Sequence, residues 1–399
     1  MMGAETITLG CRLNFAESEA MRGLAGDDAL IVNSCAVTNE AVRQTRQAIR
    51  RAHRERPERK IIVTGCAAQL DPTSFAAMPE VAKVIGNADK YRADAFASEN
   101  RVVRSDVMTA SPPPVAAGFL ARVRSFVAVQ TGCDHRCTFC SIWQARGASR
   151  SLPYEAVREA VVRELDAGAK EIVLTGVDIT SFEGGLGPLC QRLLADLSSL
   201  KRLRLSSLDS IEIDDALMEL VAGEPRLLPH FHLSLQAGDD LILKRMKRRH
   251  SRADAVATVA ALKKARPDVT IGADLIAGFP TESEAAAQNS RDLIRDCDIV
   301  AAHIFPFSPR PDTPAARMPQ LERETVKARA ARLREIAADH RNRWFDSLVG
   351  TRQKLLIENS EKGHADNFAP ALVSGSKRGD MGSASITGRD GDLLIGIFE

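Results

Sequence analysis

The chain has 399 residues, of which 44% are hydrophobic and 27% charged, a composition typical of an ordinary globular protein. This length exceeds the roughly 250–300 residues at which one hydrophobic core stops growing, so we expect two or three domains. The formal charge of +2 excludes a strongly basic chain, so any affinity for nucleic acid must come from local patches. The sequence shows no secretory leader and no apolar run of the roughly 20 residues that cross a bilayer, so we expect a cytoplasmic protein without a membrane partner.

Three short apolar runs in the first 70 residues each end at a cysteine. TITLGC ends at Cys11, ALIVNSC ends at Cys35, and KIIVTGC ends at Cys66. Each run predicts a strand of a parallel α/β sheet, and the carboxyl ends of parallel strands meet at one edge. One such cysteine is usually a small buried hydrophobe, but three in equivalent positions favour a shared thiolate site. In a cytoplasmic chain, cysteines more often indicate a metal or catalysis than disulfides.

A second group of thiols lies in GCDHRCTFC, after a predicted strand over 123–129. Cys133, Cys137 and Cys140 follow a C-x3-C-x2-C spacing, which places three sulfurs within reach of one metal centre. Thiolates are the ligands that hold iron–sulfur clusters, and a cluster with only three of them leaves one iron open to another ligand. The alternatives are three surface thiols or a zinc loop completed by His135, although zinc sites favour paired C-x2-C elements.

Strand-like segments then alternate with helical stretches through the middle of the chain. They span 171–177, 202–208, 230–236, 269–279 and 300–308. Together with 123–129 they give six strand–helix units, which predict an α/β fold with a partial TIM-type (β/α)6 barrel. Ligands in such barrels bind at the carboxyl ends of the strands, where several segments carry glycine or small polar residues. For a single such residue, a simple turn is the alternative.

At this point the sequence resembles a known family. The C-x3-C-x2-C loop resembles that of the radical S-adenosylmethionine (SAM) superfamily, and the order of motifs resembles the methylthiotransferases over essentially the whole chain. The motifs include GCRLNFAESE, VTGCAAQLDP, TGCDHRCTFCSIWQARGASRS and DLIAGFPTE. The resemblance implies that Cys133, Cys137 and Cys140 hold a SAM-cleaving [4Fe–4S] cluster. It also implies that the catalytic trio of Cys11, Cys35 and Cys66 holds a second [4Fe–4S] cluster, whose open iron carries the sulfur to be transferred.

The same resemblance implies further components of the reaction. One SAM supplies the methyl group and another supplies a 5′-deoxyadenosyl radical, so both clusters must face a shared cavity between the first sheet and the barrel mouth. A reductant such as flavodoxin or ferredoxin and a sulfur donor are needed as partners. Many superfamily members have a Gly-Gly-Glu turn where this chain has LTGVD. The expected SAM contacts are strand residues of the barrel: Thr175, Gly176, Ser206, Gln236 and Asp274.

Two stretches point to the substrate. NSCAVTNEAVRQTRQAIRRA and HIFPFSPRPDTPA resemble the branch that acts on N6-threonylcarbamoyladenosine at position 37, in the anticodon loop of tRNA. The alternatives are the same chemistry on isopentenyladenosine-37 or on a ribosomal-protein aspartate, and a noncatalytic iron–sulfur regulator that binds RNA. Two basic segments are candidates for phosphate contacts, with a solvated helix face as the alternative: a stripe of Arg43, Arg46, Arg50 and Arg54, and the patch 244–252.

Changes in composition predict the domain boundaries. We expect a methylthiotransferase domain over 1–110, a proline-rich linker over 111–118, a radical SAM barrel over 119–349 and a small β-barrel over 350–399. The last segment resembles the OB-like TRAM domain, although its only aromatic residues are Phe368 and Phe398. Cys190 and Cys297 fit no ligand pattern and are expected in the core.

Overall fold

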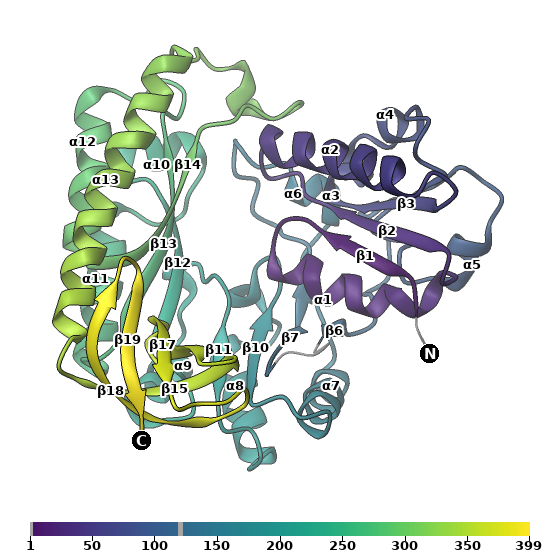
Figure 1. The fold of residues 1–399 in the computed structure, drawn as a ribbon. Helices are drawn as coiled ribbons and strands as arrows, with labels where there is room; N and C mark the ends of the chain where they lie inside the picture. The colour runs from purple at the N-terminus through teal and green to yellow at the C-terminus, as the bar shows by residue number, and fades with distance from the viewer. Residues whose placement is uncertain (1–2, 119–122) are drawn as a thin grey trace.

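The computed structural model describes residues 3–118 and 123–399, and it begins with a sheet of five parallel strands (Figure 1). The strands follow chain order across the sheet: β1 Glu5–Thr8, β2 Ala29–Ser34, β3 Lys60–Gly65, β4 Lys83–Ile85 and β5 Val102–Val103. The helices between them are α1 Arg12–Met21, α2 Asn39–Glu55, α3 Cys66–Leu70, α4 Pro72–Ala76 and α5 Ala93–Ala97. The three predicted strands before the early cysteines are therefore neighbours in one parallel sheet.

The sequence explains why these elements form. All six residues of β2 are buried, as expected for a parallel strand that is covered on both faces. The helix α2 begins after Thr38, whose side chain accepts a hydrogen bond from Ala41 N (3.1 Å) and so caps the helix. Ile49 is fully buried against the sheet, and the partly buried Val42 and Ala52 lie on the same helix face, as the helical spacing predicted.

The middle of the chain forms the predicted partial (β/α)6 barrel, with six parallel strands. They are β7 Arg124–Ala128, β10 Glu171–Thr175, β11 Leu203–Leu205, β12 His230–Gln236, β13 Thr270–Ala277 and β14 Ile299–Pro306. Isolated parallel bridges join β11 to β12, and the short β6 Ala117–Gly118 pairs antiparallel with the edge strand β7. The connecting helices cover the outside: α7 Tyr154–Asp166, α8 Leu186–Asp196, α9 Asp215–Gly223, α11 Arg252–Ala265 and α12 Glu284–Asp296.

Alternation along the strands separates the outer face of the barrel from its interior. In β12, Phe231, Leu233 and Leu235 are buried beneath the helices, while the intervening residues of the strand face inward and are only partly buried. The first domain docks beside β7, where Phe15 of α1 makes an edge-to-face contact with Phe126 (5.7 Å between ring centroids). Short elements at the mouth include β8 Gln130–Thr131, α6 Ile142–Arg146, β9 Arg150–Ser151 and α10 Asp240–Met246.

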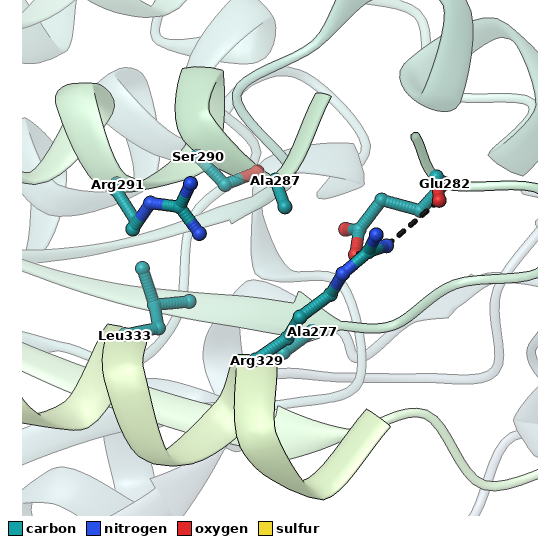
Figure 2. A pocket seen from close by; sticks show the side chains of 7 residues that line it. All are labelled: Ala277, Glu282, Ala287, Ser290, Arg291, Arg329 and Leu333. Carbon is teal, nitrogen blue, oxygen red and sulfur yellow. Dashed lines mark hydrogen bonds and ion pairs between the residues drawn. The ribbon is translucent and has the colours of Figure 1, made fainter. Parts of the chain in front are cut away.

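The long helix α13, Arg323–Leu348, leads from the barrel to the last domain. Figure 2 shows how it is attached: Arg329 Nη1 donates to Glu282 O (2.7 Å) and to Glu282 Oε2 (2.9 Å). The space beside this pair measures about 10 Å³, which is room for one water at most. It is therefore a gap in helix packing and too small for a cofactor.

The last domain is a closed barrel, which confirms the predicted fold of this segment. Its strands run in the order β15 Arg352–Asn359, β16 Lys362–Ala365, β17 Pro370–Ser374, β19 Leu393–Phe398 and β18 Met381–Asp390. The loop between β16 and β17 closes the amino-terminal end of the larger barrel, where Arg204 Nη2 donates to Ala365 O (2.8 Å). Phe368 in that loop stacks between His230 and His364, with centroid distances of 5.0 and 4.7 Å. This aromatic residue therefore serves docking between domains.

The expected domain boundaries at 110, 118 and 349 stay a prediction. Residues 117–118 of the expected linker already form β6 on the barrel sheet, while residues 119–122 lie outside the described part of the chain. Cys190 and Cys297 are fully buried, in agreement with their expected place in the core. Among residues 3–118 and 123–399, no helix combines the length and the apolar composition that crossing a bilayer requires.

Candidate active site

The C-x3-C-x2-C loop lies between β8 and α6, at the carboxyl ends of the barrel strands. Cys133 N donates to Gly147 O (3.1 Å), which holds the start of the loop, and Thr138 N donates to the last carbonyl of α10 (3.1 Å). The loop then closes on itself, because Cys140 N donates to Cys137 O (3.1 Å). The three thiols are thereby held on one short, fixed loop.

The acidity of these thiols is set by their surroundings. Burial raises the pKa of Cys133 to about 12, and the negative charges of Asp178 and of the other two sulfurs oppose its ionisation further. Burial also raises the pKa of Cys140 to about 11. A positively charged iron–sulfur core that binds all three sulfurs removes this mutual repulsion. The donor set therefore fits a thiolate-held iron cluster.

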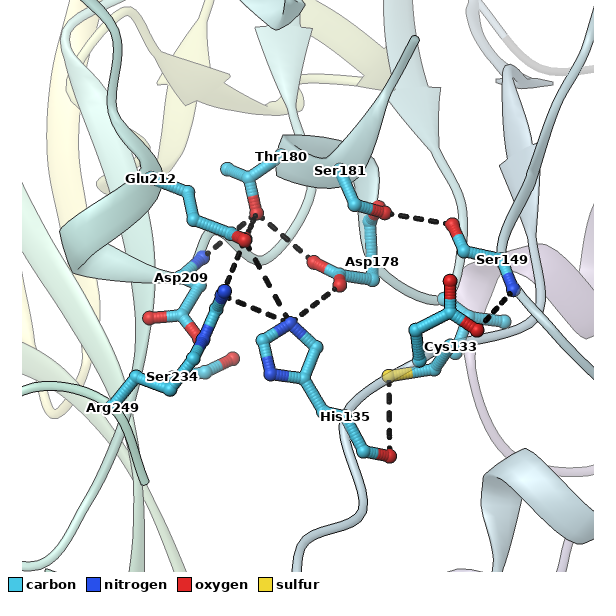
Figure 3. Close-up of polar contacts among 12 residues, drawn as sticks. Cys133, His135, Ser149, Asp178, Thr180, Ser181, Asp209, Glu212, Ser234 and Arg249 are labelled. Carbon is cyan, nitrogen blue, oxygen red and sulfur yellow. Dashed lines mark hydrogen bonds and ion pairs between the residues drawn. The ribbon is translucent and has the colours of Figure 1, made fainter. Parts of the chain in front are cut away.

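A polar network supports the loop from the barrel side (Figure 3). His135 Nε2 lies 2.9 Å from Asp178 Oδ2, and Thr180 Oγ1 donates to Asp178 Oδ1 (3.0 Å) and to Glu212 Oε2 (2.8 Å). Arg249 also donates to Glu212 and approaches His135 Nε2 (3.0 Å). His135 Nε2 thus contacts both Asp178 and Arg249 at the barrel mouth.

The three early cysteines meet at the carboxyl edge of the first sheet. Gly10 has a φ of +99°, and a Cβ on it would lie 2.8 Å from Cys35 Sγ, so only glycine lets this sulfur approach the turn that carries Cys11. Gly65 before Cys66 has a φ of +92°. Burial raises the pKa of Cys35 to about 11, and the charges of Cys66 and Cys11 contribute to it. The sheet therefore brings these three thiols together.

The two thiol groups face each other across the contact between α3, which begins with Cys66, and α6, which follows Cys140. Ala145 and Ile142 of α6 belong to the hydrophobic core of the first domain. Asn87 Nδ2 donates to Ala145 O of α6 (2.8 Å) and lies 3.9 Å from Cys66 Sγ, so it links this helix to the first group of thiols. Both trios therefore border one region between the sheet and the barrel mouth.

Sequence reasoning missed the side chain that ties this region together, Arg146 at the end of α6. Its Nε donates to Cys66 Sγ (3.2 Å), and its Nη1 and Nη2 donate to the two oxygens of Glu17 (2.6 and 2.9 Å). Lys90 Nζ lies 2.7 Å from Glu17 Oε2, and all three charged groups are buried. Burial alone would raise the pKa of Glu17, but Arg146 and Lys90 lower it to about 2. The signal in the sequence that could have indicated this charge cluster was Glu17, an acidic residue on the buried face of α1.

Four of the five expected SAM contacts lie at the carboxyl edge of the barrel. Thr175 ends β10, and a Cβ on Gly176 would lie 2.8 Å from Gln130 O, so this glycine permits close backbone approach. Ser206 N donates to Leu174 O (2.9 Å) just beyond β11. Gln236 ends β12 with a φ of 69°, a strained conformation of the kind found at ligand sites.

The fifth expected contact, Asp274, lies elsewhere. It sits in the middle of β13, inside the barrel, and already accepts hydrogen bonds from two imidazoles, His232 and His303. It therefore does not share the strand-end position of the other four expected contacts. Gln130, which sequence reasoning missed, organises the mouth instead: its Oε1 accepts from Val177 N (3.1 Å) and Asp178 N (2.9 Å).

The predicted basic surfaces are smaller than the sequence indicated. In the patch 244–252, the side chain of Arg248 is 7% exposed and donates to Asp209 (2.8 Å), Arg249 contacts Glu212, and Arg252 contacts Asp296. These arginines pair with carboxylates of the protein itself, and phosphate binding by this patch stays a prediction. On α2, Arg43, Arg46 and Arg50 have acidic neighbours, and only Arg54 of the stripe has no ion pair within the described part of the chain.

Comparison with known proteins agrees with this geometry. Residues 127–294 match the radical SAM superfamily, and residues 4–86 match a family described as the uncharacterised protein family UPF0004. A threonylcarbamoyladenosine tRNA methylthiotransferase MtaB from Rickettsia prowazekii is 44% identical, over 92% of this chain and 91% of the relative. The chain belongs to the tRNA methylthiotransferase family.

Other members of this family are more distant. An enzyme of the same description from Thermotoga maritima is 36% identical, over 88% of this chain and 85% of its own. A tRNA-2-methylthio-N(6)-dimethylallyladenosine synthase from Maricaulis maris is 30% identical, over 97% of this chain and 93% of the relative. Among solved structures, the radical SAM methyltransferase TsrM from Kitasatospora setae shares the fold with a TM-score of 0.56 and 14% identity, over 74% of this chain and 68% of TsrM. The radical SAM family implies SAM and one [4Fe–4S] cluster for this methylthiotransferase.

Proposed function

We propose that the protein inserts a methylthio group at C2 of N6-threonylcarbamoyladenosine at position 37 of tRNA, and that it uses two [4Fe–4S] clusters. The names of its more similar relatives support the substrate. The single observation that supports the two-cluster mechanism is the contact between α3 and α6, where Arg146 Nε donates to Cys66 Sγ (3.2 Å).

Each group of residues has a separate task. Cys133, Cys137 and Cys140 would hold the cluster that, with SAM, supplies the radical needed to activate an unreactive aromatic C–H bond. Cys11, Cys35 and Cys66 would hold the second cluster, at the place where sulfur is delivered. The strand ends at Thr175, Gly176, Ser206 and Gln236 would orient SAM at the barrel mouth.

The protein's own contribution is a fixed geometry between the two sites. Arg146 follows the cluster loop by six residues, yet its guanidinium donates to the sulfur of Cys66 in the other domain. Glu17 accepts from that guanidinium and also pairs with Lys90, which fixes the guanidinium between the two domains. A fixed geometry suits a reaction in which the sulfur must already be positioned next to the carbon where a short-lived radical forms. A reductant such as flavodoxin or ferredoxin and a sulfur donor would serve this site in the cytoplasm, where tRNA is found.

The test is Cys66→Ala, with Cys297→Ala as the matched control because that thiol is fully buried in the hydrophobic core of the barrel and belongs to neither trio. After anaerobic reconstitution we expect about eight irons per chain in the unchanged protein and in the control, and about four in Cys66→Ala. Incubated with SAM and a reductant, Cys66→Ala should still release 5′-deoxyadenosine but yield no thiomethylated nucleoside. Thiomethylated product from Cys66→Ala would refute the role of the second trio.

Mass spectrometry of tRNA nucleosides from a deletion strain tests the substrate. We expect loss of the methylthio form of threonylcarbamoyladenosine. Loss of methylthio-isopentenyladenosine, or of the methylthio group on a ribosomal protein, would assign the same chemistry to another substrate. Failure of the reconstituted protein to release any 5′-deoxyadenosine would instead favour a noncatalytic regulator.

A further inference from the structure

Three neighbouring strands of the barrel place an imidazole–carboxylate–imidazole cluster inside it (Figure 1 shows β12, β13 and β14 side by side). Asp274 Oδ1 lies 2.9 Å from His232 Nε2 and 3.2 Å from His303 Nδ1, so one carboxylate oxygen holds both rings. The ring centroids are 4.7 Å apart. The methylthiotransferase chemistry described above uses none of these three side chains.

The cluster is built to fix the two rings. Gly272 stands opposite His232 in the register of β12 and β13, and a Cβ on it would lie 2.5 Å from His232 Nδ1. Burial alone would raise the pKa of Asp274, but the hydrogen bonds from His232 and His303 hold it well below its usual range. The carboxylate is thus charged, and it orients the ring of His303, whose side chain is 63% exposed, with Nε2 left for another partner.

A cation from the other domain reaches the same interior. The guanidinium of Arg12, the first residue of α1, lies 5.5 Å from the ring of Phe126 and 5.4 Å from that of Phe368. The residue is exposed to solvent. Among residues 3–118 and 123–399, no carboxylate forms an ion pair with Arg12.

Arg12 and the imidazole cluster are neighbours. The guanidinium of Arg12 lies 5.4 Å from the ring of Phe368, and that ring stacks on His230 with 5.0 Å between centroids. His230 lies two residues before His232 on the inward-facing side of β12, and the ring of His232 lies 4.7 Å from that of His303. The guanidinium groups of Arg124 and Arg204 lie 5.2 and 4.9 Å from the same Phe368 ring. An unpaired guanidinium beside an oriented imidazole is a donor set for an anion, because both groups offer N–H donors and Arg12 is permanently charged. The surrounding guanidinium groups disfavour a metal cation at the same place.

We propose that Arg12 and His303 bind the carboxylate of the threonyl group on the substrate base, with Asp274 and His232 as positioning residues for His303. This inference rests on the proposed function, since threonylcarbamoyladenosine carries a carboxylate and a hydroxyl at the place where dimethylallyladenosine carries only an apolar chain. An apolar substituent bound here would shield the guanidinium from water without pairing its charge, which is costly. The site thereby selects among adenosines at position 37 by the charge of their N6 substituent.

The test compares binding of anticodon stem-loops that differ only at this carboxylate. One RNA carries threonylcarbamoyladenosine, a second its neutral methyl ester, and a third unmodified adenosine, and fluorescence anisotropy at one fixed salt concentration gives each Kd. We expect the reconstituted protein to prefer the acid over the ester by about tenfold or more, as for a charge-assisted hydrogen bond. In Arg12→Gln and in His303→Ala, this preference should fall to within about twofold, while the Kd for the unmodified RNA stays unchanged.

Controls separate a local effect from misfolding. Arg295→Gln removes an exposed arginine of the outer helix α12 and should keep the full preference. Arg12→Lys retains the charge and should keep part of it, and iron content shows whether Cys11, next to Arg12, still binds its cluster. Equal binding of acid and ester by the unchanged protein, or an unchanged preference in both Arg12→Gln and His303→Ala, would overturn the inference. The proposed function fails on a different result, namely no thiomethylation of the acid-bearing RNA by the unchanged protein.

Discussion

Replacing Glu17 by Gln tests whether a buried charge cluster holds the two thiol sites together. The change removes the one carboxylate that compensates Arg146 and Lys90, which lie 2.6 and 2.7 Å from its oxygens. The pKa of Glu17, lowered from 4.5 to about 2, corresponds to about 3 kcal/mol, because a tenfold change in proton affinity is worth about 1.4 kcal/mol. Since two buried cations are left unpaired, we expect the free energy of unfolding of the first domain to fall by about 3–5 kcal/mol.

Trp143 in α6 provides a local probe, since Trp344 is the only other tryptophan. In a Trp344→Phe background, urea unfolding followed by fluorescence reports the contact between α6 and the first domain. Because the pKa of Glu17 is lowered in the folded protein, its contribution to the free energy of unfolding is present above about pH 4.5 and is lost as the pH falls towards 2. Glu17→Gln should lack this dependence of stability on pH. The control is Glu40→Gln, which removes an exposed partner of Arg43 and should change little. If Glu17→Gln lowers the free energy of unfolding no more than Glu40→Gln does, the reasoning is refuted.

Two further substitutions test the supports of the site. Gly65→Ala should lose the iron of the first trio, because a Cβ on Gly65 would lie 2.6 Å from Ser34 N at a φ of +92°. Gly23→Ala should keep that iron, because Gly23 has open space around it. Equal iron content in the two variants would contradict this prediction. Glu171→Gln should destabilise the barrel by about 3–5 kcal/mol and speed proteolysis near residue 350. The reason is that Glu171 compensates the positive charges of Arg124, Arg202 and Arg204 beneath the last domain. Unchanged urea unfolding would argue against this prediction.

The sequence was sufficient for the strands and for the grouping of thiols, because both depend on local pattern and on a general property of parallel sheets. The predicted strand over 230–236 has the same bounds as β12. The strand expected over 202–208 is shorter, Leu203–Leu205, since the chain turns after it and resumes pairing only through a single bridge from Leu208 to Leu233. In the last domain, β16 has too few apolar residues to be predicted from its own sequence.

Charges were predicted less well, because a basic residue in the sequence does not show where its partner lies. The stretch 244–252 has the composition of a phosphate-binding patch, yet the partner of Arg248 is Asp209, 39 residues earlier in the chain. Likewise, Arg146 and Glu17 are 129 residues apart. Only the fold brings such groups within reach, so their role in holding the site could not be obtained from local pattern.

In each thiol trio, one sulfur lies beside an arginine that is held by a carboxylate. Both arginines belong to the barrel segment. Arg146 donates to Cys66 and is anchored by Glu17, while Arg248 lies 3.8 Å from the sulfur of Cys137 and is anchored by Asp209. A guanidinium thus lies beside one sulfur of each trio, while burial raises the pKa of Cys35 to about 11 and that of Cys133 to about 12. Such a cation is suited to compensate the negative charge of thiolates that bind iron. The first domain supplies three thiols, and the cation beside one of them comes from the barrel domain. In the proposed mechanism, the site that delivers sulfur is therefore complete only when both domains are docked, next to the loop that would hold the SAM-cleaving cluster.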